Sequence, residues 1–143
     1  MPSDAPAPAR PGAARATSTG WGRLLIAVYA VFAVAATGRS SIQLATQADE
    51  APFPYALSAL AAVLYLVATW ALASDRPGHR RVAWAAVTVE AAGVVVVGTL
   101  SLVDEALFPD DTVWSAFGAG YAFFPALLPV AGIAWLLATR PRG

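Results

Sequence analysis

One acidic residue lies inside the apolar part of this sequence. Glu90 falls within the apolar run from Val82 to Val103. A charge at membrane depth is costly, and ionisable residues there commonly serve a function. Counted at about 1.5 Å per helical residue, Tyr29 and Tyr65 in two other apolar runs lie at roughly the depth of Glu90. We therefore predict a buried polar cluster of Glu90, Tyr29 and Tyr65, in which both phenols hydrogen-bond to the carboxyl group.

Two roles fit such a cluster. In the first, the hydrogen bonds set the register of neighbouring helices. In the second, Glu90 titrates as part of a transport or proton-relay step. Burial favours the neutral form of a carboxyl group, so we expect Glu90 to be protonated at neutral pH in either case. The residues alone leave both roles open.

A second polar group is predicted near the opposite membrane surface. Arg39 lies about 24 Å along the same helix from Arg23. Gln43 follows at a four-residue spacing, and Tyr121 falls at a similar level in the last apolar run. We predict an outer polar cluster of Arg39, Gln43 and Tyr121. Its arginine has three alternatives: the lipid headgroups, a ligand carboxylate, or an ion pair with an outer-loop acid such as Asp104, Glu105 or Asp110, of which the ion pair is favoured.

Several kinds of chemistry are excluded by composition. The chain has no cysteine, which removes disulfides, thiolate metal sites and thiol redox chemistry. Its single histidine, His79, cannot supply two axial haem ligands. No Ser-His-Asp set, phosphate-binding glycine loop or metal-ligand spacing is present, so we expect no enzyme activity, catalytic residue, metal or cofactor. A formal net charge of zero argues against a nucleic-acid partner.

The elements that position these residues are membrane spans. The 143 residues suffice for one domain, with 58% apolar and 13% charged residues, against about 45–50% and about 25% in soluble domains. We predict an all-α integral membrane protein, an antiparallel four-helix transmembrane bundle in the lipid bilayer. The predicted segments are a disordered tail at 1–20, spans at about 22–46, 54–73, 82–103 and 113–139, and a short tail at 140–143.

The last predicted span carries two unusual features. Pro125 and Pro129 lack amide hydrogens, so a continuous helix there either kinks or breaks to line a site. We favour the kink. Gly118, Ala122 and Ala126 recur every four residues, and small residues at this spacing let helices approach closely in a membrane. They predict a packing face on this span.

Orientation follows from the arginines. Most of them flank the predicted inner ends of the spans, and only Arg39 lies on the other side. Arginine stays cytoplasmic during insertion. We therefore expect both termini in the cytoplasm and the protein in a bacterial plasma membrane. The five tryptophans near predicted span ends suggest an aromatic belt. A rival interpretation makes the first span a signal peptide, cleaved after residues 33–35.

The sequence also resembles a known kind of protein. The stretches GRSSIQLATQADEAPFPYALSALAAVLYLVATWAL, RVAWAAVTVEAAGVVVVGTL and LFPDDTVWSAFGAGYAFFPALLPVAGIAWLL are similar to small four-span integral membrane proteins of actinobacteria. The likeness covers roughly residues 24–139. It implies four spans and an uncleaved first helix, and it carries over no catalytic or binding residue.

Two hypotheses for function remain. The first is a non-enzymatic membrane protein that acts by helix–helix association with a second copy or another membrane protein. Short loops and small-residue faces favour it. The second is a small, dimeric proton-coupled transporter or permease that uses Glu90.

Overall fold

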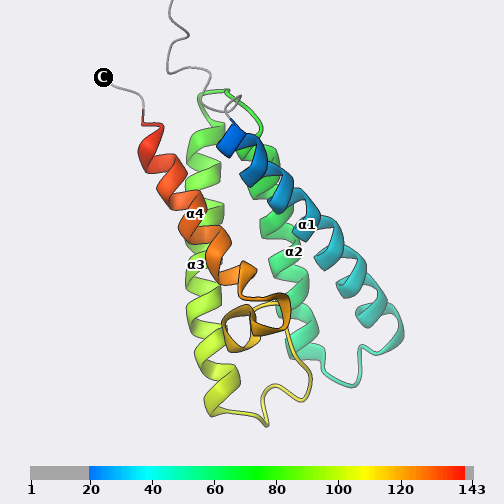
Figure 1. Cartoon of the computed structure of the whole chain (residues 1–143). Helices are drawn as coiled ribbons and strands as arrows, with labels where there is room; N and C mark the ends of the chain where they lie inside the picture. The colour runs from blue at the N-terminus through cyan, green and yellow to red at the C-terminus, as the bar shows by residue number, and fades with distance from the viewer. Residues whose placement is uncertain (1–19, 141–143) are drawn as a thin grey trace, which may run out of the picture.

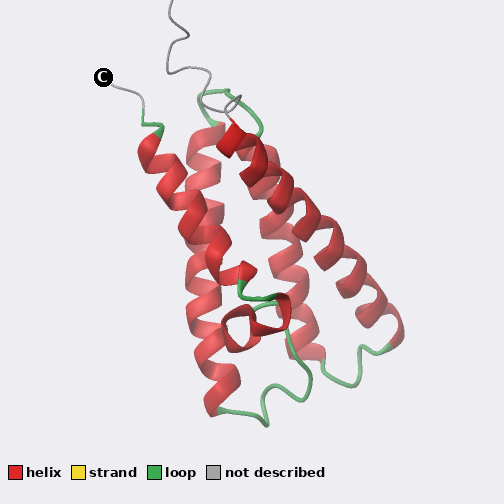
Figure 2. Ribbon diagram, viewed as in Figure 1, coloured by secondary structure: helices red, strands yellow, loops and turns green. Residues whose placement is uncertain are grey.

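The computed structural model describes residues 20–140. Apart from their innermost residues, the predicted tails at 1–20 and 140–143 lie outside this part. Residues 20–140 form five helices and no strands (Figures 1 and 2). The elements are α1 (Gly20–Thr46), α2 (Pro52–Leu72), α3 (His79–Val103), the short 3₁₀ helix η2 (Ser115–Tyr121) and α4 (Phe124–Ala138).

Three of these helices, α1, α2 and α3, are long and apolar enough to cross a membrane. The pair η2 and α4 makes a fourth candidate span if the two are counted together. The long helices alternate in direction, as Figure 1 shows. The all-α expectation is thus confirmed for residues 20–140, with three or four candidate spans.

The alternation of direction separates the charges between the two ends of the bundle. One end, here called the basic end, carries the arginines of the α1 start, the α2–α3 turn, the α3 start and the α4 end, namely Arg23, Arg76, Arg80, Arg81 and Arg140. The other, the acidic end, carries the loops at 47–51 and 104–114, with Asp49, Glu50, Asp104, Glu105, Asp110 and Asp111.

Small side chains bring α1 and α2 together. These two helices make the most extensive contact in the bundle, whereas the contact between α1 and α4 is much smaller. The face that α1 buries includes Ala33, Ala36 and Ser40, and α2 buries Ala61 and Ala68. Because lipid removes most of the hydrophobic drive between helices, close backbone approach through small residues supplies the packing energy instead.

The fourth candidate span is broken, so the favoured prediction of a kink within one helix across 113–139 is wrong. The axes of η2 and α4 differ by 102°. Between them, Ala122 and Phe123 adopt left-handed backbone angles with φ of 53° and 62°. The break places Pro125 at the second residue of α4, where a missing amide hydrogen leaves no hydrogen bond unmade. Pro129 stays inside the helix.

The break also removes the predicted small-residue face of this span. Gly118 lies in η2 with φ of 85°, and Ala122 lies in the break. Only Ala126 is in α4, so the three residues share no helix face. Gly118 instead lies against the ring of Pro125, where an added Cβ would be 2.7 Å from Cδ. The glycine allows both this contact and the left-handed backbone.

Trp114 departs from the predicted aromatic belt. Its side chain is 1% exposed, whereas that of Trp70 is 56% exposed. The indole lies over Gly93 of α3, where an added Cβ would be 2.6 Å from the ring. The segment before η2 therefore inserts a large side chain into the bundle.

Candidate functional site

The buried carboxyl group of Glu90 is the centre of the inner site. Tyr29 of α1 donates a hydrogen bond from its hydroxyl to Glu90 Oε2 at 2.8 Å. Both side chains have no exposed surface. The other carboxyl oxygen, Oε1, is buried and has no hydrogen-bond partner. The structure thus brings together Tyr29 and Glu90 and leaves one polar atom of the pair unpaired.

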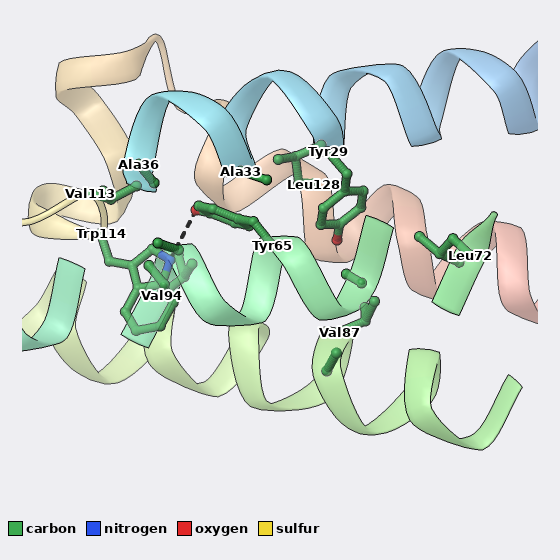
Figure 3. Close-up of a cluster of buried hydrophobic side chains, with 14 of the residues drawn as sticks. Tyr29, Ala33, Ala36, Tyr65, Leu72, Val87, Val94, Val113, Trp114 and Leu128 are labelled. Carbon is green, nitrogen blue, oxygen red and sulfur yellow. Dashed lines mark hydrogen bonds between the residues drawn. The ribbon is translucent and has the colours of Figure 1, made fainter. Parts of the chain in front are cut away.

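Tyr65 lies beside this pair but does not bond to Glu90, which corrects the predicted second phenol. Its ring centroid is 6.2 Å from that of Tyr29. Its hydroxyl accepts a hydrogen bond from Trp114 Nε1 at 3.2 Å. Figure 3 shows the two phenol hydroxyls pointing apart, that of Tyr65 toward Trp114 and that of Tyr29 toward the level of Val87. The two tyrosines lie at similar depths along their helices, so their rings are close together. The rotation of each helix about its axis points the two hydroxyl groups in different directions.

The fourth helix contributes backbone to the same centre. Gly132 of α4 is buried, and an added Cβ there would lie 3.3 Å from the Tyr29 hydroxyl and 3.2 Å from Val87 Cγ1. A side chain larger than hydrogen would press on both neighbours. Helices α1, α3 and α4 therefore meet at the Tyr29 hydroxyl, and α2 adds the Tyr65 ring.

At the acidic end, Arg39 makes contacts other than the expected ion pair. Its Nη1 donates a hydrogen bond to the Tyr121 hydroxyl, and its Nη2 donates to the backbone carbonyl of Asp111 at 3.1 Å. The guanidinium carbon lies 5.7 Å from the Tyr121 ring centroid. Asp110 instead accepts from the Tyr55 hydroxyl at 2.8 Å. Arg39 therefore ties α1 to η2 and to the loop before it.

Gln43 does not join Arg39 and Tyr121, so the outer cluster is a pair. It is buried on the face that α1 turns to the bundle, and its Oε1 has no hydrogen-bond partner. Ser40, on the same face, also has a buried hydroxyl without a partner. Four-residue spacing placed Gln43 near Arg39, but a small rotation around the helix axis puts the two side chains in different surroundings.

A set of hydroxyl side chains that sequence reasoning did not bring together holds the segment leading into η2 and the start of that helix. Ser101 Oγ of α3 accepts from the Ala116 amide at 2.8 Å. Ser58 Oγ of α2 accepts from the Val113 amide at 3.3 Å. Thr112 and Ser115 accept from amides of the same segment, those of Trp114 at 3.0 Å and Thr112 at 2.8 Å.

These bonds have a clear physical purpose. Backbone that is not regularly helical has amides without partners, and within a membrane no water is available to bond them. The side-chain oxygens take the place of water. A hint was present in the sequence, because Asp110-Asp111-Thr112 and Ser115 crowd polar residues around Trp114 at the start of an apolar run.

Chemically, the inner site can hold a proton and little else. It offers one carboxyl group and one phenol in an enclosed apolar setting. Within residues 20–140 there is no group of three or more His, Asp or Glu side chains placed to hold a metal ion. Comparison with known protein families, curated proteins and solved structures finds no match for this chain. Its class is therefore defined by the helices themselves, which are compatible with a multi-pass membrane protein.

Proposed function

We propose that the protein is a non-enzymatic integral membrane protein that acts by helix–helix association, and that the outward face of α1 is its contact surface. The partner is a second copy or another membrane protein. The observation that carries this proposal is the open stripe on α1. Its members are small or β-branched and all exposed: Ala27, Val31, Val34, Gly38 and Ser41.

The stripe has the geometry of a membrane helix contact. Its residues are spaced by four, three, four and three, the spacing of a seam between two helices. Nothing lies within 4 Å of a Cβ added at Gly38, so a partner backbone can approach there. In the most apolar stretch of α1, 28% of the residues are buried; the corresponding shares are 44% in α2 and 33% in α3. Of these three helices, α1 thus has the smallest buried share in its most apolar stretch.

The inner site supports this proposal because it fixes the position of α1 relative to α3. The Tyr29–Glu90 bond joins α1 to α3 across the bundle. It has no exposed surface through which a substrate can enter. The bond therefore orients α1, and with it the outward stripe, relative to the rest of the bundle.

Mass measurement of the protein purified in a mild detergent tests the association. We expect an assembly larger than one chain, and we expect Gly38→Ile to disperse it because the added side chain holds the partner helix away. Ala92→Ile is the matched control, since Ala92 is an exposed small residue on α3. Loss of the assembly in both variants, or in neither, contradicts the proposal.

We further propose that the protein lies in a bacterial plasma membrane with the basic end and both termini in the cytoplasm. The support is the gathering of arginines at one end of the bundle. A topology reporter fused in the turn at 76–81 should report the cytoplasm, and one at Asp110 the outside. The opposite result at either place contradicts this orientation.

A second function is favoured by one observation. The buried Oε1 of Glu90 has no hydrogen-bond partner, and a titratable carboxyl group among membrane-spanning helices is the group that a dimeric proton-coupled transporter would use. In vesicles with a pH gradient, the native protein would then carry protons, and Glu90→Gln would abolish the flux while leaving the fold intact. Absence of proton flux with the native dimer contradicts this second function.

A further inference from the structure

The interior of the bundle is polar on only one side of Glu90. Apart from Glu90 and the tyrosines, the fully buried polar side chains of residues 20–140 all lie in the acidic-end half: Ser40, Gln43, Ser58, Thr112 and Ser115. Between Glu90 and the basic end, the fully buried side chains are apolar, among them Leu72, Val87 and Leu136. The two ends of the bundle therefore offer Glu90 very different surroundings.

Two of these polar side chains carry atoms without a partner in the protein. Ser40 Oγ and Gln43 Oε1 are buried and make no hydrogen bond, in side chains that are 4% and 8% exposed. Ser58 differs, because its hydroxyl accepts from the Val113 amide. A buried polar atom without a partner is costly, and in folded proteins an internal water commonly bonds it. Gln43 Oε1 can only accept, so its partner is a donor, and water is the smallest one.

Ser40 and Gln43 lie on the face of α1 that leads to the inner site. This face buries Tyr29, Ala33, Ala36, Ser40 and Gln43, which are spaced by four, three, four and three residues and so form one line along the helix. Gln43 lies about 4.5 Å from the end of α1, and Tyr29 about 21 Å further in. Only alanines separate Ser40 from Tyr29 on this line, so no large side chain of α1 blocks it.

The Tyr65 hydroxyl lies part of the way along the same line. Figure 3 shows it beside Trp114, on the acidic-end side of the Tyr29 hydroxyl. It accepts a hydrogen bond from Trp114 Nε1, and as a hydroxyl it can also donate one. Tyr29 in turn bonds Glu90 Oε2, while Glu90 Oε1 has no partner. From the acidic end inward, the polar groups are therefore Gln43, Ser40, Tyr65, Tyr29 and Glu90.

We propose that water enters the bundle from the acidic end along this face of α1, binds at Gln43 and Ser40, and lets Glu90 exchange its proton with the acidic side of the membrane and not with the basic side. The inference rests on the second function, in which Glu90 titrates, and it adds the side from which the proton comes. The acids of the acidic end attract cations to the place where this path begins.

Single cysteines test for water in the full chain, which has no cysteine of its own. A thiol binds a metal ion as the thiolate, so silver ions modify it only where water and ions reach it. In sealed vesicles, Ser40→Cys should bind Ag⁺ added on the acidic side and lose its labelling by a maleimide after denaturation. Glu105→Cys, at an exposed position of the acidic-end loop, marks the side to which the Ag⁺ was added.

Ala86→Cys is the matched control for the basic side. Ala86 and Ser40 are each 4% exposed. Ser40 lies about 9 Å from the acidic end of α1, and Ala86 about 10 Å from the basic end of α3. Ala86→Cys should therefore keep its full maleimide labelling with Ag⁺ on either side.

Proton exchange at Glu90 itself is measured by infrared spectroscopy of the native protein in D₂O. The band of the Glu90 carboxyl group is the one that is lost in Glu90→Gln. We expect its deuterium shift to appear more slowly when Ser40→Ala and Gln43→Leu are combined, because the two side chains that hold water are gone. Thr99→Val, at an exposed position of α3, should leave the rate unchanged.

Three outcomes overturn the proposal: full labelling of Ser40→Cys despite Ag⁺, equal loss of labelling in Ala86→Cys, or an unchanged exchange rate in the combined variant. If Ser40→Cys does not fold, the unfolding temperature of Ser40→Ala decides. Compared with Ser41→Ala, which makes the same change of helix propensity at an exposed position, a lower temperature supports a bonded water and a higher one overturns it.

The results also separate this path from transport. Proton flux through a protein whose Ser40→Cys variant does not react with Ag⁺ supports the second function and overturns the path. A reactive Ser40→Cys together with sided exchange at Glu90, but with no flux, supports the path and contradicts the second function.

Discussion

The acidic-end half and the basic-end half of the bundle use polar side chains for different purposes. In the acidic-end half the backbone is irregular from the end of α3 to the start of α4. Its amides are bonded by hydroxyl groups such as those of Ser58 and Ser101. In the basic-end half the backbone is regularly helical apart from the α2–α3 turn. Its buried carboxyl group, Glu90, bonds a side chain from another helix and serves no backbone group.

The role of a polar residue at membrane depth depends on the backbone beside it. Polar side chains beside irregular backbone replace missing water and are explained by structure alone. A polar side chain among regular helices has no such duty, so it either specifies how helices pair or carries out a function. Glu90 belongs to the second kind, and Arg39, which bonds the Asp111 carbonyl, to the first.

The largest expected effect comes from removing the side chain that fills the acidic-end half. Trp114→Ala removes a buried indole and its bond to Tyr65, and it should cost about 3–5 kcal/mol of stability. Thermal unfolding in mild detergent measures this loss. Trp70→Ala, a change at an exposed tryptophan, should have little effect. Similar losses in both variants would contradict the buried position of Trp114.

In the basic-end half, Glu90→Leu should cost up to about 3 kcal/mol, because the buried Tyr29 hydroxyl loses its acceptor. Glu90→Gln keeps an acceptor oxygen and the shape of the side chain, so its unfolding temperature should stay close to that of the native protein. If the two variants are equally unstable, the hydrogen bond is not what the carboxyl group contributes.

A smaller effect is expected at Ser101. Ser101→Ala leaves the Ala116 amide without its acceptor and should lower stability by about 1–2 kcal/mol. Thr99→Val is the control, because Thr99 is exposed on the same helix and bonds only the Val95 carbonyl of that helix. Hydrogen exchange at the Ala116 amide should rise in Ser101→Ala and stay unchanged in the control; unchanged exchange in both would count against the replacement of water by this hydroxyl.

The smallest effect is expected at the centre of the basic-end half. Gly132→Ala adds a methyl group 3.2 Å from Val87 Cγ1 and 3.3 Å from the Tyr29 hydroxyl. A shift of a few tenths of an ångström accommodates it, at about 1 kcal/mol. Gly120→Ala meets nothing within 4 Å and should unfold at the native temperature. A stabilised Gly132→Ala would mean that α4 packs more loosely there.

Much of the architecture could be predicted from the sequence, because it depends on apolar content, on the lengths of apolar runs and on the rise of a helix per residue. Apolar content predicted helices apolar enough to cross a membrane, and run lengths located the three long helices to within about three residues at each end. Depth in a helix also adds at about 1.5 Å per residue. This is why Tyr29 of α1 and Glu90 of α3, two helices that run in the same direction, were expected at one level and are found bonded.

Features that depend on the rotation of a helix about its axis, and on contacts across the bundle, could not be predicted from the sequence. A turn of one residue is about 100°, so an uncertain helix rotation leaves the direction of a hydroxyl open even where its depth is known. The rotation of α2 points the Tyr65 hydroxyl toward Trp114. The rotation of α1 points Gln43 into the bundle, away from Arg39.

The break in the fourth span belongs to the same group. Pro125 is compatible both with a kink inside a helix and with the second residue of a new one. The choice rests on partners distant in sequence: Gly93, which leaves room for Trp114, and Ser101, which bonds the Ala116 amide. An irregular segment is stable at membrane depth only if other helices supply the missing hydrogen bonds, and no local pattern in the chain shows that they do.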